Sequence, residues 1–264
     1  MIPRLNIQDG ITPLYHTFLE AVVAAGFAGD VESSYSSRLA VATDNSVYQW
    51  LPQAVLFPRS TADVVLLTTL AREPKFRAIR FTARGGGTGT NGQSLTDGLI
   101  VDLSRHMHGI LEFNLQERWV RVQAGLVKDK LNEFLKPHGL FFSPELSTSN
   151  RATIGGMINT DASGQGSLVY GKTSAHVLAV TAVLEDGSLL DAKPVSGSEL
   201  ADKLAREDRE GDIYRQVLAT ARDKRDEIEA TFPKLTRFLT GYDLKHVYEP
   251  ASETVDLSRL ICGS

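Results

Sequence analysis

The stretch from residue 78 to residue 94, AIRFTARGGGTGTNGQS, limits the fold more than any other part of the chain, because glycine fills five of the eight positions after Arg84. Alternating apolar residues predict a strand over 78–82, and the apolar run at 98–103 predicts a second strand after the glycines. Glycine permits positive φ angles and lets a ligand approach the main chain closely. Consecutive N–H groups in such a turn form a concavity that binds anions. The sequence therefore predicts a phosphate-binding loop between two strands.

Two phosphate-binding motifs match the sequence by their letters but not by their setting. Gly87-x-Gly89-x-x-Gly92 matches the dinucleotide fingerprint, which requires the loop to open a helix. Here a strand is predicted instead, so a Rossmann site is not favoured.

The second motif is the P-loop pattern GxxxxGK[ST], which residues 166–173 fit. A P-loop lies between a buried strand and a helix. The preceding residues are small and polar, and the run VLAVTAVL at 177–184 predicts a strand. A P-loop NTPase remains an alternative that would require a helix after Thr173.

Composition limits the partners and the compartment. The chain has 264 residues and a formal net charge of −4, so nothing indicates a nucleic-acid partner. No apolar run has the length of a membrane span, and no signal peptide is recognisable. The single cysteine, Cys262, excludes an internal disulfide framework. We expect a cytoplasmic protein, with peripheral attachment to the inner membrane left open, and we predict no metal site.

Local patterns predict most of the remaining elements. Residues 27–53 are expected to form loops, and the polar tract at 143–171 is expected to be a long loop that packs against something. Its glycines and those of the first loop suggest two walls of one extended ligand. The other expected elements are a helix from Thr12-Pro13 to Gly26, a strand at 54–57, a helix capped by Ser60 and Asp63, a strand at 119–123, a helix at 128–136 ended by Gly139, a hairpin over 177–190, and charged helices within 197–230.

Seven segments together carry a family resemblance. They are LPQAVLFP at 51–58, RGGGTG at 84–89, VDLS at 101–104, VQAG at 122–125, ATIGG at 152–156, YG at 170–171 and VLEDG at 183–187. In this order and spacing they resemble the FAD-binding domain of vanillyl-alcohol-oxidase/PCMH-type flavoproteins. The chain is most similar to bacterial FAD-linked D-2-hydroxyacid dehydrogenases, the group with D-lactate and D-2-hydroxyglutarate dehydrogenases.

The resemblance implies an α+β fold of PCMH type, in which two α/β subdomains hold FAD between them. It places an N-terminal helix and lead-in at 1–50, a first FAD-binding subdomain at 51–112, and a second at 113–264 with a helical insertion at 197–232. It also implies that the substrate domain is absent. The chain's end resembles the start of a segment that continues in the family, so we expect part of a longer enzyme that is inactive alone.

The resemblance also assigns the cofactor site. The first glycine loop, Gly85 to Gly89, would wrap the FAD pyrophosphate, and Gln93 and Ser94 would close it. The complete predicted set is Arg84, Gly85, Gly86, Gly87, Thr88, Gly89, Thr90, Gln93, Ser94, Pro144, Thr153, Gly155, Gly156, Ser163, Gly164 and Gly171. Thr88 stands where some relatives carry a histidine that bonds the flavin, so non-covalent FAD is expected. For Arg84, a phosphate contact and a structural ion pair are both open, and Tyr242 and His246 are candidates to approach the flavin.

The implied reaction is oxidation of a D-2-hydroxyacid to the 2-oxoacid, with hydride passing to flavin N5 and then to an unknown electron acceptor. No catalytic base is assigned. A related group carries an iron–sulphur cluster in its C-terminal part. The alternatives are another FAD oxidoreductase on the same scaffold, such as a sugar-alcohol oxidase or a UDP-sugar reductase, and a non-catalytic FAD-binding module.

Overall fold

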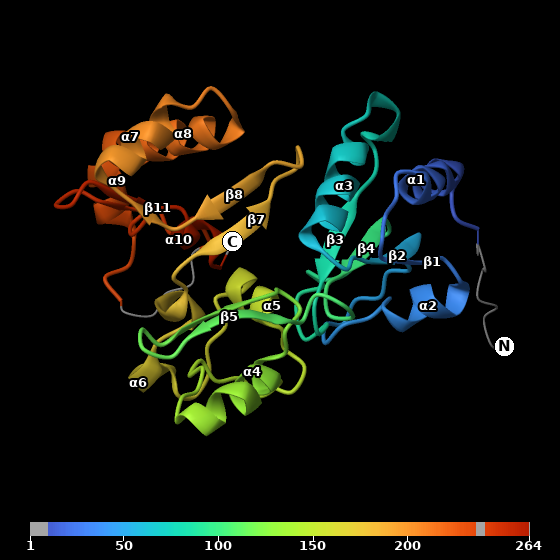
Figure 1. Cartoon of the computed structure of the whole chain (residues 1–264), viewed down its shortest axis with the longest axis horizontal. Helices are drawn as coiled ribbons and strands as arrows, with labels where there is room; N and C mark the ends of the chain where they lie inside the picture. The colour runs from blue at the N-terminus through green and yellow to red at the C-terminus, as the bar shows by residue number, and fades with distance from the viewer. Residues whose placement is uncertain (1–9, 236–240, 264) are drawn as a thin grey trace. The chain divides into compact units, whose positions relative to one another are not determined.

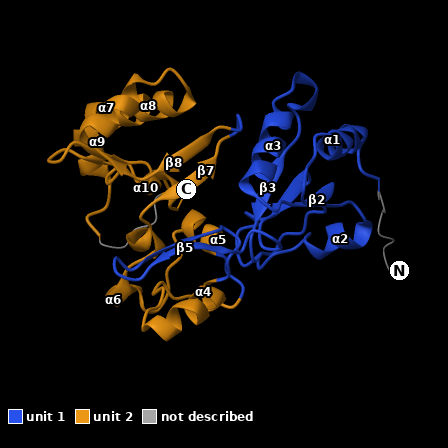
Figure 2. Cartoon of the chain, in the orientation of Figure 1, with its two compact units in different colours: residues 1–127, 151–153, 185–187 blue, residues 128–150, 154–184, 188–264 orange. Residues whose placement is uncertain are grey.

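The computed structural model describes residues 10–235 and 241–263. They form two compact units, shown in different colours in Figure 2. Unit 1 comprises residues 1–127, 151–153 and 185–187, and unit 2 comprises 128–150, 154–184 and 188–264. The three-part division that the family resemblance implies stays a prediction. Among the described residues, no helix is both long enough and apolar enough to cross a bilayer.

Unit 1 is built on a four-stranded sheet with the order β1-β2-β4-β3 (Figure 1). Strands β2 and β3 run parallel to β4, and β1 is antiparallel to β2. The strands are β1 (Asp30–Glu32), β2 (Ala54–Phe57), β3 (Phe81–Arg84) and β4 (Leu99–Asp102); the helices are α1 (Pro13–Ala24), α2 (Tyr35–Ala40), α3 (Thr61–Ala71) and the 3-10 turn η1 (Pro74–Phe76); a hairpin of β5 (Ile110–Asn114) and β6 (Trp119–Val122) completes it. Phe18, Leu67 and Leu99 are at the centre of its apolar core.

Three of the sequence predictions for unit 1 need correction or confirmation. The strand predicted at 78–82 begins only at Phe81, because the 3-10 helix at Pro74–Phe76 is followed by a turn at 77–78. The prediction that residues 27–53 form only loops is wrong, since β1 and α2 lie there. Both are too short to show a periodic pattern. The strand predicted at 119–123 is confirmed as β6.

Helix α3 begins with the predicted capping box. The Ser60 side chain accepts from the Asp63 N–H, and the Asp63 carboxylate accepts from the Ser60 N–H. Asp63 also accepts from the N–H groups of Arg59 and Ala28, at 2.8 and 2.9 Å. The buried Asp63 carboxylate thus connects the start of α3 to Arg59, which follows β2, and to Ala28, in a loop 35 residues earlier in the chain.

Unit 2 contains two small antiparallel sheets, β7-β8 and β10-β11-β9. Its strands are β7 (Val180–Val183), β8 (Leu189–Ala192), β9 (Pro194–Val195), β10 (Tyr248–Glu249) and β11 (Thr254–Asp256). Its helices are α4 (Lys128–Leu135), η2 (Lys136–His138), α5 (Ile154–Asn159), α6 (Ser167–Tyr170), η3 (Thr173–His176), α7 (Gly197–Ala205), α8 (Arg209–Asp223), α9 (Arg225–Thr231) and α10 (Ser258–Ile261). The predicted hairpin and the predicted charged helices are confirmed. The tract predicted as a loop at 143–171 instead includes α5 and α6.

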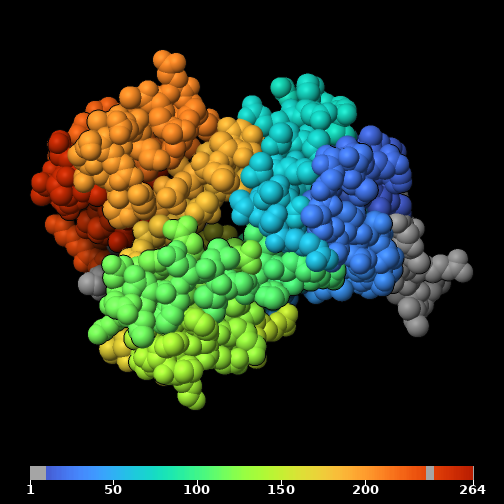
Figure 3. Space-filling model, viewed as in Figure 1, coloured from blue at the N-terminus to red at the C-terminus, as the bar shows by residue number. Residues whose placement is uncertain are grey.

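The charged segment at 197–230 is amphipathic. Figure 3 shows its orange atoms at the surface of the unit. Its apolar stripe faces inward, because Tyr214, Leu218 and Ala221 are buried in one cluster with Val195 and Val255. The Tyr214 hydroxyl is buried and has no hydrogen-bond partner among the described residues. Burial raises the pKa of this hydroxyl above its usual value, so it stays protonated.

Replacing Tyr214 with phenylalanine is expected to raise the free energy of unfolding by about 1 kcal/mol, because a buried hydroxyl without a partner costs about that much. Tyr15→Phe is the matched control with the opposite sign. The buried Tyr15 hydroxyl accepts from the Arg80 N–H at 3.3 Å, so its loss should lower the unfolding free energy by about 1 kcal/mol. Urea unfolding of both variants measures the effects, and destabilisation by Tyr214→Phe would contradict the first.

Candidate functional site

The first glycine loop joins β3 directly to β4, and no helix lies between them. The strand–loop–strand prediction is therefore confirmed, and the dinucleotide fingerprint lacks the helix it needs. The P-loop pattern at 166–173 also lacks its helix, because only the four-residue 3-10 helix η3 begins at Thr173 and the next element is strand β7. Neither nucleotide-binding motif has the structural setting that it requires.

The backbone of the loop presents a run of unused donors. For the N–H groups of residues 85 to 90, no acceptor is found within the described part of the chain. Gly87 and Gly92 have φ angles of 61° and 75°, which favour glycine. Unpaired N–H groups that are partly open to solvent bind a polyanion readily. This donor set suits the pyrophosphate of a dinucleotide.

The loop also packs closely on the segment from Arg151 to Thr153, which belongs to the same unit. A Cβ atom at Gly85 would lie 2.1 Å from Thr153 Oγ1, and one at Gly86 would lie 2.1 Å from the Arg151 carbonyl oxygen. Arg151 donates to the Gly86 carbonyl at 3.2 Å. The structure thus brings Gly85, Gly86 and Thr153 together, as a shared site requires.

Side chains at the two ends of the loop hold it in place. The buried Arg84 guanidinium donates to the carbonyls of Val41 and Thr43 and to Ser94 Oγ, at 3.3, 2.8 and 3.3 Å. Ser94 Oγ in turn donates to Asp44. Of the two roles considered for Arg84, these contacts favour the structural one, although the acceptors are carbonyls and a hydroxyl and not the carboxylate of an ion pair. Burial lowers the pKa of the guanidinium. Phosphate contact by Arg84 stays a prediction.

The other loop residues differ in exposure. Gln93 Oε1 accepts from the Asn91 N–H at 2.9 Å, and its amide lies against Gly89. Thr88 is half-buried, whereas Thr90 is exposed. Both threonines sit in the run of unused N–H groups.

The remaining predicted residues lie in unit 2. Gly155 and Gly156 are in α5, and Pro144 is buried in the segment before it. A Cβ at Gly164 would lie 1.9 Å from the Glu145 carbonyl oxygen, so Gly164 packs on the backbone of the residue that follows Pro144. Gly171 has a φ of 78° at the end of α6. The structure therefore brings Gly164 next to the segment that carries Pro144, and the assignment of these residues and of Ser163 to FAD stays a prediction.

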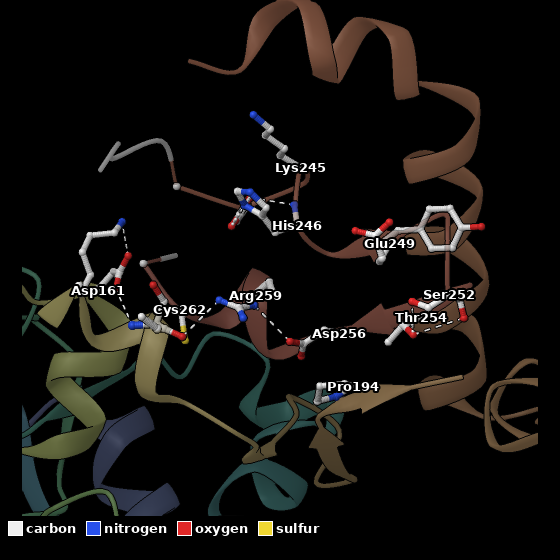
Figure 4. Close-up of a pocket in the computed structure, with 18 of the residues that line it drawn as sticks. Asp161, Pro194, Lys245, His246, Glu249, Ser252, Thr254, Asp256, Arg259 and Cys262 are labelled. Carbon is white, nitrogen blue, oxygen red and sulfur yellow. Dashed lines mark hydrogen bonds and ion pairs between the residues drawn. The ribbon is translucent and has the colours of Figure 1, made fainter. Parts of the chain in front are cut away.

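A cavity of about 710 Å³ in unit 2 was not found by sequence reasoning (Figure 4). Gly171 lines it, together with two ion pairs, Asp161–Lys172 and Asp256–Arg259. His246, a candidate flavin neighbour, also lines it and contacts the Asp243 carboxylate at 2.8 Å. Tyr242 is 64 % exposed. The VDLSR segment at 255–259, which repeats residues 101–105, contributes Asp256 and Arg259 to the lining.

Cys262 also lines this cavity, but its side chain is buried. Burial, followed by the nearby Asp161 carboxylate, raises the pKa of the thiol to about 11. Because only the thiolate reacts, we expect the native chain at pH 8 to react with a disulfide reagent about two hundredfold more slowly than the unfolded chain, whose thiol pKa is about 8.5. Absorbance of the released thiolate measures both rates. Complete native reaction at the unfolded rate would contradict the prediction.

Comparisons with known proteins agree with this geometry. The chain is 61% identical to the D-2-hydroxyglutarate dehydrogenase of Pantoea ananatis and 56% identical to that of Escherichia coli, each over 265 residues. Both alignments cover the whole chain but 26% of the relative, so the chain spans about a quarter of their length. Among solved structures, an alkyldihydroxyacetonephosphate synthase aligns with a TM-score of 0.62 and 21% sequence identity. The alignment covers 73% of this chain and 41% of the synthase chain.

That structural likeness shows the α+β fold of PCMH type that the resemblance implied. The model of the family described as "FAD binding domain" matches residues 52–193, which include both glycine clusters and the complete predicted set of cofactor-binding residues. The chain belongs to this FAD binding domain family.

Proposed function

We propose that this chain binds FAD without a covalent bond and forms the cofactor-binding part of a flavin-dependent enzyme that oxidises D-2-hydroxyacids, with D-2-hydroxyglutarate as the first substrate to test. The observation that carries the proposal is the run of unused N–H groups at residues 85–90, in a loop whose Gly85 and Gly86 pack too closely on Thr153 and Arg151 to carry a side chain. The high identity to D-2-hydroxyglutarate dehydrogenases over the whole chain supports the substrate class.

The proposed roles follow from the donor chemistry. The N–H groups of residues 85–90 donate to the pyrophosphate oxygens, while Arg84 and Ser94 keep the loop in its shape. The residues proposed to line the flavin are Pro144, Thr153, Gly155, Gly156, Ser163, Gly164 and Gly171. Thr88 offers no nucleophile comparable to a histidine, which supports non-covalent binding. When bound, FAD supplies the acceptor for the hydride that leaves the substrate's α-carbon.

Several finer points remain proposals of the same kind. An iron–sulphur cluster needs several cysteine ligands, and this chain has one cysteine, so its ligands would belong to the remainder of the longer relatives. A peripheral membrane location is likewise a proposal for the whole protein, and the electron acceptor and the proton-accepting base are not assigned.

Titration of the purified chain with FAD, followed by flavin fluorescence and absorbance, tests the proposal. We expect saturable binding of FAD and no response to ATP with Mg²⁺. Acid precipitation of the loaded chain should leave all flavin in the supernatant, since no covalent bond is formed. Gly87→Ala is expected to weaken FAD binding, because its Cβ would lie 2.4 Å from the loop's own Arg84 side chain. Gly139→Ala is the control, because Gly139 also has a positive φ angle but a Cβ there meets nothing within 4 Å. Failure of the chain to take up FAD would overturn the proposal.

A further inference from the structure

His176 joins two segments of unit 2 that carry predicted flavin-lining residues. Its Nε2 lies 2.7 Å from the Tyr170 carbonyl oxygen and 3.1 Å from Ser143 Oγ. Tyr170 precedes Gly171, and Ser143 precedes Pro144. The imidazole therefore fixes the spacing between the segment at 143–145 and the end of α6.

The short contact with Tyr170 decides where the proton of His176 lies. A carbonyl oxygen only accepts hydrogen bonds, so a nitrogen 2.7 Å away must carry the hydrogen. Nε2 is therefore protonated and has no lone pair left for a second donor. Ser143 Oγ, next to the same nitrogen, can only accept from it.

The consequence concerns the hydroxyl proton of Ser143. Since Nε2 cannot accept it, and no other acceptor contacts this hydroxyl within the described residues, the proton is available to a ligand. Ser143 is half-buried and held from both sides. Asn132 of α4 exchanges two hydrogen bonds with the Phe142 backbone, at 2.7 and 3.3 Å, and the Phe142 ring meets the His176 ring edge-to-face at 5.9 Å. A donor held in this way is pre-organised for binding.

We propose that Ser143 donates a hydrogen bond to an oxygen acceptor of the bound FAD, and that His176 is the residue that orients it. The inference rests on the proposed function and adds to it a binding residue and a positioning residue that the sequence did not indicate. The surroundings agree, because Pro144 follows Ser143 directly and Gly164 packs on the backbone of Glu145, two residues after Ser143, and both were assigned to the cofactor on other grounds.

The first test needs no cofactor. Long-range ¹H–¹⁵N spectra of the histidine-labelled chain report which ring nitrogen carries the proton, and His176→Gln assigns the signal among the six histidines. We expect the neutral ring to be protonated at Nε2. Protonation at Nδ1 alone would overturn the inference.

The second test is a double-mutant cycle on the dissociation constant of FAD, measured by flavin fluorescence. Ser143→Ala is expected to weaken binding about fivefold to tenfold, the value of one hydrogen bond. His176→Ala should have a similar effect, and the double variant should be no weaker than either single one. His176→Gln keeps an N–H donor for the Tyr170 carbonyl and should restore part of the affinity. Ser147→Ala, at an exposed serine of the same segment, is the matched control and should have no effect.

Each outcome of the cycle has one meaning. Unchanged affinity in Ser143→Ala, or effects of Ser143 and His176 that simply add, would overturn the inference while leaving the proposed function standing. Failure of the parent chain to bind FAD would overturn the proposed function and this inference together. Thermal melting of each variant shows whether a loss of affinity reflects loss of the fold.

Discussion

Replacing Asp63 with alanine is expected to lower the unfolding free energy of unit 1 by about 3 kcal/mol, since charge-assisted hydrogen bonds and orphaned buried donors each contribute about 1–3 kcal/mol. The carboxylate is 4 % exposed and accepts from three backbone N–H groups, those of Ala28, Arg59 and Ser60. Alanine would leave all three donors without their acceptor. Denaturant unfolding followed by circular dichroism measures the change.

Two further substitutions separate the contributions of Asp63. Ser60→Ala removes only the side chain that accepts from the Asp63 N–H, so it should cost about 1 kcal/mol. Asp63→Asn keeps one acceptor oxygen, so its unfolding free energy should lie between those of Asp63→Ala and Ser60→Ala. Equal stability of Asp63→Ala and Ser60→Ala would show that the three contacts of the Asp63 carboxylate contribute no more than the Ser60 side chain alone.

Asp63 also illustrates what the sequence could and could not predict. The spacing of Ser60 and Asp63 predicts the helix start, because the capping box involves residues three positions apart. The bond to Ala28 involves a residue 35 positions away, and no local pattern encodes it. The same holds for β1, which has three residues and pairs antiparallel with β2. A strand of three residues forms only because it pairs with β2, and its own sequence does not predict that pairing.

The repeated pentapeptide VDLSR makes the same distinction within one chain. At 101–105 the Asp102 carboxylate accepts from the N–H and hydroxyl of Ser104, at 2.8 and 2.6 Å. At 255–259 the Asp256 carboxylate accepts from Ser258 in the same way, at 3.0 and 2.6 Å. In each copy the first two residues end a strand and the next three leave it, so five residues suffice to specify this turn.

The arginines that end the two copies have different partners. Arg105 lies over the Phe57 ring, 3.3 Å from its centroid, and contacts Asp30. Arg259 instead donates to Asp256 and to the Ser174 carbonyl. Local sequence therefore specifies the turn, whereas the tertiary surroundings choose what the long side chain contacts.

The candidate site follows the same rule. Its glycines are visible in the sequence, because a loop of this composition has few other uses than a tight turn or a close approach. Ser143 and His176 gave no signal, since their relation depends on a fold that brings together residues 33 positions apart. The resemblance supplied the assignment to FAD, which the pattern of residues alone left as a phosphate-binding loop.

Gly86→Ala is expected to have the largest effect on the proposed cofactor site. The new Cβ would lie 2.1 Å from the Arg151 carbonyl oxygen and 2.7 Å from its carbon, and these are backbone atoms that cannot rotate away. The loop and the Arg151–Thr153 segment must therefore move apart, which should cost about 2–3 kcal/mol of stability. The displaced N–H groups would no longer converge on one anion, so FAD affinity should fall by more than tenfold.

Gly10→Ala is the matched control, because a Cβ there meets nothing within 4 Å. It should change neither the melting temperature nor the dissociation constant of FAD. Thermal melting and flavin titration of the two variants separate the two roles of Gly86. If Gly86→Ala lost stability but kept its affinity for FAD, the close approach would be needed only for packing, and the N–H groups of residues 85–90 could not be the pyrophosphate site.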